Sequence, residues 1–256
     1  MDNQIDIIMG QHAALAAIEN LTRVIISLKC TKEFFEKNKI AIENRGISKL
    51  FIVSRKEIDS EIKNNVHQGI LLKCKSLKQI SLEEINKNEK NIVILDSLND
   101  SQNVGSVLRT SYLFGIKTII YNKDNSFKIN PFLMKSASGA FEKINFIEVI
   151  NLNRTVDKLK KMGYWIVGFD VNAKNNISEV PKDLKKVLIF GSEGKGIRSL
   201  ILKNCDFKTK ISFNVDDKKI ESLNVSNCVS IALYECLKKW KSFQNFIIHS
   251  KKQEKR

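Results

Sequence analysis

After residue 90, the sequence repeats one pattern three times: an apolar run is followed by a polar segment rich in glycine, serine or asparagine. The three pairs are 91–95 with 99–110, 186–190 with 191–197, and 208–215 with 220–227. Apolar runs of this length are typical of strands in a parallel sheet, and ligands bind beyond the carboxyl ends of such strands. The pattern therefore predicts an α/β fold in which the three polar segments lie at one edge of a sheet.

The same alternation extends through the C-terminal two thirds of the chain. Strands are predicted at 92–95, 117–121, 146–150, 164–169, 187–190 and 208–213, and helices at 103–114, 131–138, 153–162, 197–203 and 225–241. Strands separated by helical patterns favour a parallel sheet that is covered on both faces. We assign residues 91–245 to this domain.

A smaller α/β domain is predicted for residues 1–75, followed by a linker at 76–90 with a short helix at 82–85. Its predicted helices are 9–18, 31–44 and 55–63, and its predicted strands are 24–28, 49–53 and 66–72. For His67 and Gln68, a turn that orders the third strand and a contact with RNA remain equal alternatives. The tail at 246–256 is basic and is predicted to be disordered.

The charge of the chain favours a polyanionic partner. The formal net charge is +15, and residues 91–256 carry 28 basic and 16 acidic groups against 15 and 12 in residues 1–90. The basic excess therefore accompanies the three polar segments. The five cysteines stand singly and the three histidines are scattered, which indicates free thiols in a cytoplasmic protein and no metal site. No apolar run approaches the roughly 20 residues of a membrane span.

Each polar segment also has a purely structural interpretation. Ser222, Asn224 and Ser226 could cap the helix that follows them, because such side chains accept hydrogen bonds from free backbone N–H groups. Arg109 could form a surface salt bridge, and the glycines around Glu193 could form an ordinary turn.

Taken together, the three segments resemble the signature of the SpoU (TrmH-like) family of RNA ribose 2'-O-methyltransferases, in the SPOUT superfamily. The resemblance implies a SPOUT α/β domain with a trefoil knot, S-adenosylmethionine as cofactor, and a homodimer formed through this domain. Residues 10–13 and 66–70 resemble the L30e-like RNA-binding domain of the branch that methylates a guanosine ribose in 23S ribosomal RNA. The implied partner is RNA, and ribosomal RNA in particular.

The resemblance also implies roles for individual residues. The matching catalytic residues are Asn103, Arg109, Glu193, Ser222 and Asn224. The matching cofactor-binding residues are Gly191, Phe213 and Leu223. The sequence departs from the family pattern at Ser101, Asn214 and Glu221, and the last of these adds a negative charge beside the expected substrate contacts.

Other functions stay open at this stage. Transfer RNA is an alternative substrate, and a noncatalytic RNA-binding protein of ribosome assembly is an alternative from another class. A nucleotide-dependent oxidoreductase is a more distant one.

The helix predicted from Val225 to Trp240 has an apolar stripe formed by Val229, Leu233, Cys236 and Trp240, and Ile231 and Tyr234 widen it. Because this apolar surface is wider than one face of the helix, we expect it to be buried on more than one side, either within the domain or against another protomer.

Overall fold

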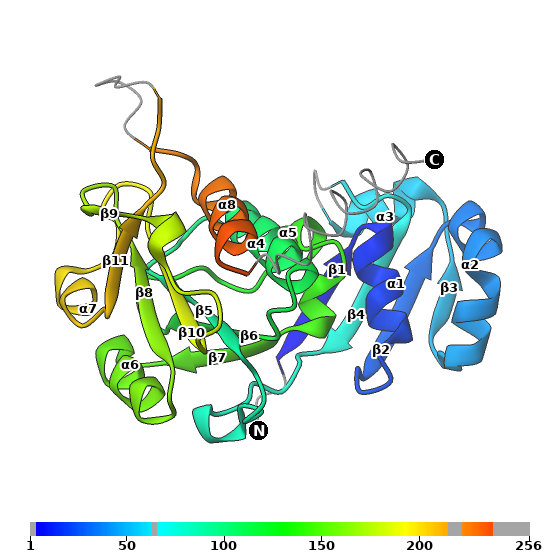
Figure 1. Cartoon of the computed structure of the whole chain (residues 1–256). Coiled ribbons are helices and arrows are strands. Elements are labelled where there is room, and N and C mark those ends of the chain that lie inside the picture. The colour runs from blue at the N-terminus through cyan, green and yellow to red at the C-terminus, as the bar shows by residue number, and fades with distance from the viewer. Residues whose placement is uncertain (1–3, 63–65, 215–221, 238–256) are drawn as a thin grey trace, which may run out of the picture.

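The computed structural model describes residues 4–62, 66–214 and 222–237, and contains a seven-stranded sheet and a four-stranded sheet (Figure 1). The larger sheet has the order β7-β6-β5-β10-β8-β11-β9, and all of its neighbouring strands are parallel. Its strands are β5 (Asn91–Asp96), β6 (Thr118–Asn122), β7 (Asn145–Val149), β8 (Trp165–Phe169), β9 (Asn175–Asn176), β10 (Lys186–Gly191) and β11 (Phe207–Lys210).

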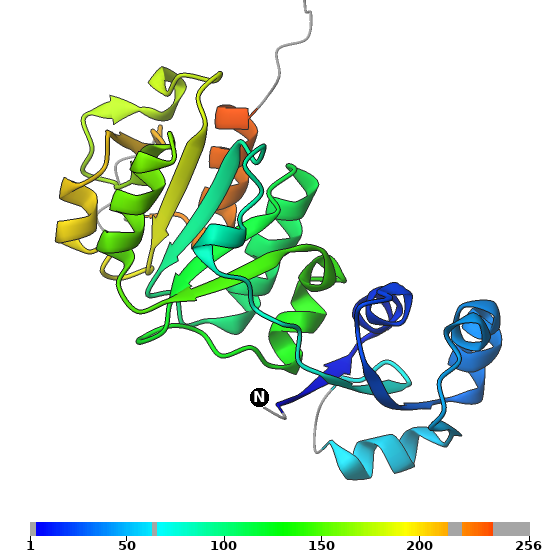
Figure 2. The same ribbon diagram turned by 90° about the horizontal axis from the view of Figure 1, so that it is seen from below.

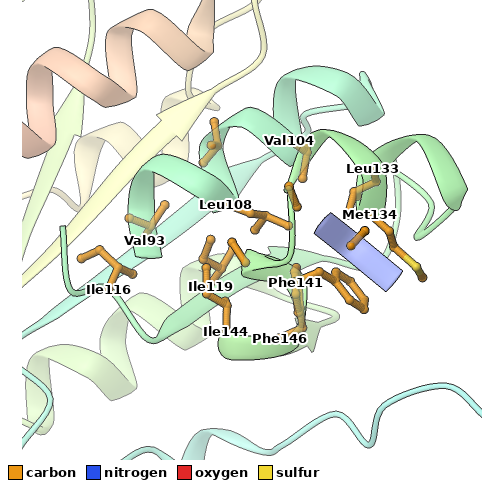
Figure 3. Packing of buried hydrophobic residues seen from close by; sticks show 14 of the residues in the cluster. Val93, Val104, Leu108, Ile116, Ile119, Leu133, Met134, Phe141, Ile144 and Phe146 are labelled. Atoms are coloured by element: carbon orange, nitrogen blue, oxygen red, sulfur yellow. The ribbon is translucent and has the colours of Figure 1, made fainter. Parts of the chain in front are cut away.

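Helices cover both faces of this sheet because its central strands carry buried apolar side chains on both sides. Within β5, Val93 and Leu95 face one core while Ile92 and Ile94 face another. The first core is covered by α4 (Ser101–Leu113), α5 (Pro131–Ser136), η2 (Ala140–Lys143) and α8 (Val225–Leu237). The second is covered by η1 (Leu82–Glu84), α6 (Leu152–Lys161) and α7 (Ser199–Lys203). Figure 3 shows Val104 and Leu108 packing near Leu133 and Ile119 in the first core.

The N-terminal sheet has the order β1-β4-β2-β3, in which β4 is antiparallel to both neighbours and β2 is parallel to β3. Its strands are β1 (Ile5–Met9), β2 (Ile25–Cys30), β3 (Leu50–Ile52) and β4 (Ile70–Lys75), and its helices are α1 (Gln11–Glu19), α2 (Lys32–Arg45) and α3 (Arg55–Glu61). Figure 2 shows this sheet and its helices beside the larger sheet.

The predicted strands and helices are confirmed, apart from small shifts at their ends and the differences that follow. Strands β1 and β9 and the 3-10 helices η2 and η3 (Ile177–Glu179) were not predicted from the sequence. Strand β4 begins at Ile70 rather than at residue 66, because Gln68 and Gly69 have φ angles of 56° and 79° and form a turn. The segment predicted to be a linker contributes to the second core, since Leu82 and Ile85 are both buried there.

A buried ion cluster joins the two sheets. The Arg23 guanidinium contacts the carboxylate of Asp6 in β1 at 2.7 Å and that of Glu142 in η2 at 3.3 Å. Asn20 donates a hydrogen bond to Glu142 at 2.8 Å. Burial raises the pKa of the Glu142 carboxyl, although the charge of Arg23 acts in the opposite direction. Buried charges are tolerated only when they are paired, so this cluster requires both sheets to be in place.

Three predictions lie outside the described residues: the disordered tail at 246–256, the position of Trp240, and the effect of Glu221. The trefoil knot also stays a prediction, because the path of the chain between Asn214 and Ser222 lies outside the described ranges.

We predict that Glu142→Ala destabilises the protein by about 3 kcal/mol, because Arg23 then remains buried with half of its counter-charge removed. The matched control is Glu43→Ala, which breaks only the exposed pair with Lys39 and should cost less than about 1 kcal/mol. Urea unfolding measures both values. Equal losses in the two variants would show that the ion cluster does not hold the sheets together.

Candidate active site

Asn103 is positioned by the start of α4. Strand β5 ends at Asp96, and Asp100 caps the helix by accepting a hydrogen bond from the Asn103 backbone N–H at 2.6 Å. An aspartate at this position satisfies one of the free N–H groups of the first turn. Asn103 therefore lies in the first turn of the helix, directly beyond the carboxyl end of a central strand.

Glu193 lies in a tight loop that follows β10. The Gly196 N–H donates to the Ser192 carbonyl at 2.8 Å, so the loop closes on itself. A Cβ atom at Gly191 would lie 2.0–2.2 Å from the backbone of Gly196 and Ile197, closer than real atoms approach. Only glycine fits at the end of this strand, which explains why the loop can turn back immediately.

Asn224 precedes α8 and uses its side chain twice. Its Oδ1 accepts hydrogen bonds from the backbone N–H and the hydroxyl of Ser226, at 2.9 and 2.6 Å. The capping interpretation of Asn224 is therefore confirmed. Its Nδ2 group remains free to donate elsewhere.

The three side chains form a closed ring of hydrogen bonds. Asn103 Nδ2 donates to Glu193 Oε1 at 2.9 Å, and Asn224 Nδ2 donates both to Glu193 Oε1 and to Asn103 Oδ1 at 3.0 Å. Within the described ranges, Glu193 Oε2 has no hydrogen-bond partner. We call Asn103, Glu193 and Asn224 the amide–carboxylate cluster.

The cluster lies beside a cleft of about 220 Å³. The lining residues are Ser97, Leu98, Asn99, Asp100, Asn103, Ser192, Glu193 and Val225. They come from the ends of β5 and β10 and from the start of α8, so the cleft occupies the sheet edge at which ligands bind in parallel α/β folds.

Residues 90–234 match the model of the SpoU rRNA Methylase family. The chain belongs to this family. It is 33% identical over 242 residues to the 23S rRNA (guanosine-2'-O-)-methyltransferase RlmB of Coxiella burnetii, an alignment that covers 91% of this chain and 95% of the relative.

Solved structures support the same fold. The SpoU methyltransferase AviRb from Streptomyces viridochromogenes, in complex with AdoMet, matches with a TM-score of 0.75 and 16% identity over 91% of this chain and 89% of that chain. The A. aeolicus TrmH/SpoU tRNA modifying enzyme matches with a TM-score of 0.52 and 26% identity over 58% and 74%. The α/β fold of a SpoU methyltransferase is therefore confirmed.

The structure brings together only part of the residue set implied by the SpoU resemblance. Arg109 is exposed, forms no ion pair within the described ranges, and follows Asn103 by six residues, or about 240° around the helix. Ser222 is exposed and, among the described residues, makes no hydrogen bond to the cluster. Of the three predicted cofactor residues, Gly191 borders the Glu193 loop, Leu223 precedes Asn224 and is half-buried, and Phe213 is 48% exposed.

The sequence analysis missed a hydrogen-bonded ion pair next to the amide–carboxylate cluster, between Asp96 and Arg198. Asp96 is fully buried and accepts hydrogen bonds from the backbone N–H and the Nε of Arg198, at 2.9 and 2.7 Å. This pair ties the end of β5 to the segment that follows the Glu193 loop. An aspartate that closes an otherwise apolar strand was the available signal in the sequence.

We predict that Gly191→Ala lowers the melting temperature, because the added methyl group must displace the backbone of Gly196; the expected cost is about 1–3 kcal/mol. Gly194→Ala in the same loop is the matched control, since a Cβ there has nothing within 4 Å. Thermal unfolding of both variants gives the comparison. If Gly191→Ala has the same melting temperature as the parent protein, the loop does not pack as tightly against Gly191 as described.

Proposed function

We propose that this protein is an S-adenosylmethionine-dependent methyltransferase that modifies the ribose 2'-hydroxyl of a guanosine in 23S ribosomal RNA. The observation that carries the proposal is the amide–carboxylate cluster, which unites the three polar segments at the ligand-binding edge of the sheet. The similarity to RlmB over nearly the whole of both chains supports the choice of substrate.

Two of the residues assigned to the cofactor adjoin the cleft or the cluster in the sequence: Gly191 precedes Ser192, which lines the cleft, and Leu223 precedes Asn224. S-adenosylmethionine, when bound, supplies a methyl group together with its own leaving group, so the protein mainly has to supply position and electrostatics. The backbone at Gly191 packs directly against Gly196 and Ile197 of the same loop, and the Leu223 backbone leads directly into Asn224. We assign cofactor binding to Gly191, Leu223 and Phe213, whose half-exposed ring can cover an adenine.

The cluster is suited to holding a hydroxyl group. Two amide donors hold Glu193 Oε1, and Oε2 remains available to accept a hydrogen bond from the ribose 2'-hydroxyl. The exposed Arg109 guanidinium can bind a phosphate of the RNA through two parallel hydrogen bonds. Arginine is a poor general base because its guanidinium stays protonated in proteins, so we assign Arg109 to orienting the substrate.

Charge and composition are consistent with an RNA substrate. A net charge of +15 attracts phosphate backbones over long distances. None of the helices in the described ranges is long and apolar enough to cross a membrane. A ribosomal RNA substrate implies that the protein acts in the cytoplasm.

Methyl transfer to defined RNAs tests the proposal. The protein is incubated with methyl-labelled S-adenosylmethionine and either transcribed 23S ribosomal RNA or bulk unmodified transfer RNA. We expect label in the ribosomal RNA, at one alkali-resistant guanosine. Label confined to transfer RNA would support the alternative substrate, and cofactor binding without transfer to any RNA would overturn the enzymatic assignment.

For the cluster itself, we predict that Asn224→Ala reduces kcat for methyl transfer by at least 100-fold, because Glu193 and Asn103 each lose one hydrogen bond. Asn227→Ala is the control: it removes an exposed amide from the first turn of α8 that makes no hydrogen bond within the described ranges. Circular dichroism should show both variants folded. Full activity in Asn224→Ala would remove the cluster from the mechanism.

We also propose that the protein is a homodimer that pairs through α4 and α8. These helices pack side by side (Figure 1) and expose Tyr112, Leu113, Phe114, Ile231 and Tyr234. The rings of Phe114 and Tyr234 meet edge-on, 6.5 Å apart, which makes the patch continuous across both helices. Arg109 lies three and four residues before Tyr112 and Leu113 on α4, so pairing through this patch would bring a second protomer close to it.

We predict that Ile231→Lys, which places a charge in this patch, converts the dimer to monomers in sedimentation at micromolar concentration. Leu233, which belongs to the apolar stripe predicted from the sequence, cannot serve for this test. Its side chain is fully buried, so a charge there would unfold the domain. Leu200→Lys on α7 is the control, because Leu200 is also apolar and is even more exposed than Ile231. A monomeric parent protein with full activity would overturn the proposal.

A further inference from the structure

The N-terminal sheet carries a second, larger cleft that methyl transfer does not use. Its volume is about 440 Å³, within the range of about 300–1,000 Å³ typical of small-molecule pockets. It is lined by Gln11, Arg55, Asp59, Val66, His67 and Gln68. We call it the His67 pocket.

His67 fixes a hydrogen-bond acceptor at the wall of this pocket. The imidazole is buried, and its Nδ1 accepts a hydrogen bond from the Gly69 N–H at 3.0 Å. The ring proton therefore lies on Nε2, which donates to Asp59 Oδ1 at 2.9 Å. The Asp59 side chain is 60% exposed, and its Oδ2 has no partner within the described ranges. The result is a carboxylate oxygen that is held in place and open to the pocket.

Gln68 supplies a donor to the same pocket. Its φ of 56° is unusual for a residue other than glycine, and such strained residues cluster at functional sites. Two hydrogen bonds hold it there: Gln11 N donates to Gln68 Oε1 at 3.0 Å, and Gln11 Nε2 donates to the Gln68 carbonyl at 3.3 Å. The Gln68 Nε2 group has no hydrogen-bond acceptor among the described residues, so both of its N–H groups can donate to a ligand.

From this arrangement we propose that the His67 pocket binds one unpaired guanine base of the RNA substrate, at a position other than the methylated nucleotide. A guanine offers neighbouring donors at N1 and N2 and acceptors at O6 and N7. Asp59 Oδ2 can accept from the first edge, while Gln68 Nε2 and Arg55 can donate to the second. Val66 is 66% exposed and gives the base an apolar surface to lie against. Unpaired bases are the part of RNA that proteins read in this way.

The pocket is joined to the catalytic side of the molecule by direct contacts. Lys135 in α5 donates from Nζ to the Val66 carbonyl at 2.9 Å. The same helix packs so closely on α4 that a Cβ at Gly105 would lie 2.4 Å from Ser136 Cβ and 2.6 Å from the Leu133 carbonyl oxygen. Gly105 is two residues from Asn103. A base held in the His67 pocket is therefore connected through α5 to α4, the helix that carries Asn103, and this fixes the RNA relative to the cluster.

This inference rests on the proposed RNA substrate, but the test begins with free nucleotides. Calorimetric titration of the full chain with GMP, AMP, CMP and UMP should show GMP binding at least tenfold more tightly than the others. Asp59→Asn should abolish that preference, because the amide places a donor where guanine needs an acceptor while its oxygen still accepts from His67. Lys56→Ala, which removes a cation from the same helix but outside the pocket, should leave the preference unchanged.

Methylation kinetics provide the second readout. Asp59→Asn should raise KM for 23S ribosomal RNA about tenfold and leave kcat and S-adenosylmethionine binding unchanged. Equal binding of all four nucleotides would indicate a phosphate contact only and overturn the guanine pocket, as would an unaltered preference in Asp59→Asn. If GMP binds selectively but no RNA is methylated, the proposed function fails and the pocket stands.

Discussion

The common direction of the strands in the large sheet is the constraint on which the rest of this structure depends. Because β5 and β10 are parallel neighbours, the segments that follow them leave the sheet at the same edge, and Asn103 and Glu193 meet although 90 residues separate them. Asn224 joins them from the start of α8 through the same side chain that caps this helix. The Asn224 side chain therefore both caps α8 and takes part in the amide–carboxylate cluster.

A second constraint ties the N-terminal sheet to this site. Arg23 is buried between carboxylates from both units, and α5 contacts the N-terminal sheet on one side and α4 on the other. The two units thus act as one scaffold. An RNA bound to the N-terminal unit, as we propose, would be positioned by the packing of helices.

The sequence was most informative where burial is complete. Apolar runs such as Ile92–Leu95 predicted the central strands, since strands buried on both faces form nearly continuous apolar runs in the sequence. It failed at β1, where Asp6 points inward because Arg23 pairs with it, so the alternation of polar and apolar residues is broken by a buried charge. Strand β9 is two asparagines long and has no apolar signal.

The amide–carboxylate cluster could be predicted from the sequence only as three polar segments at one edge of the sheet. The Asp96–Arg198 pair and the outward direction of Arg109 depend on the packing of α4 and of the loop after β10, which spacing alone does not reveal.

The central claim is that the three polar segments form one site for the methyl donor and the ribose. A crystal structure of the protein with S-adenosylhomocysteine tests it most directly. The account predicts that the ligand lies along the backbone at Gly191 and Leu223, with the amide–carboxylate cluster intact and Glu193 Oε2 facing the position of the lost methyl group. A ligand bound away from these segments, or a cluster whose hydrogen bonds are replaced on binding, would contradict it.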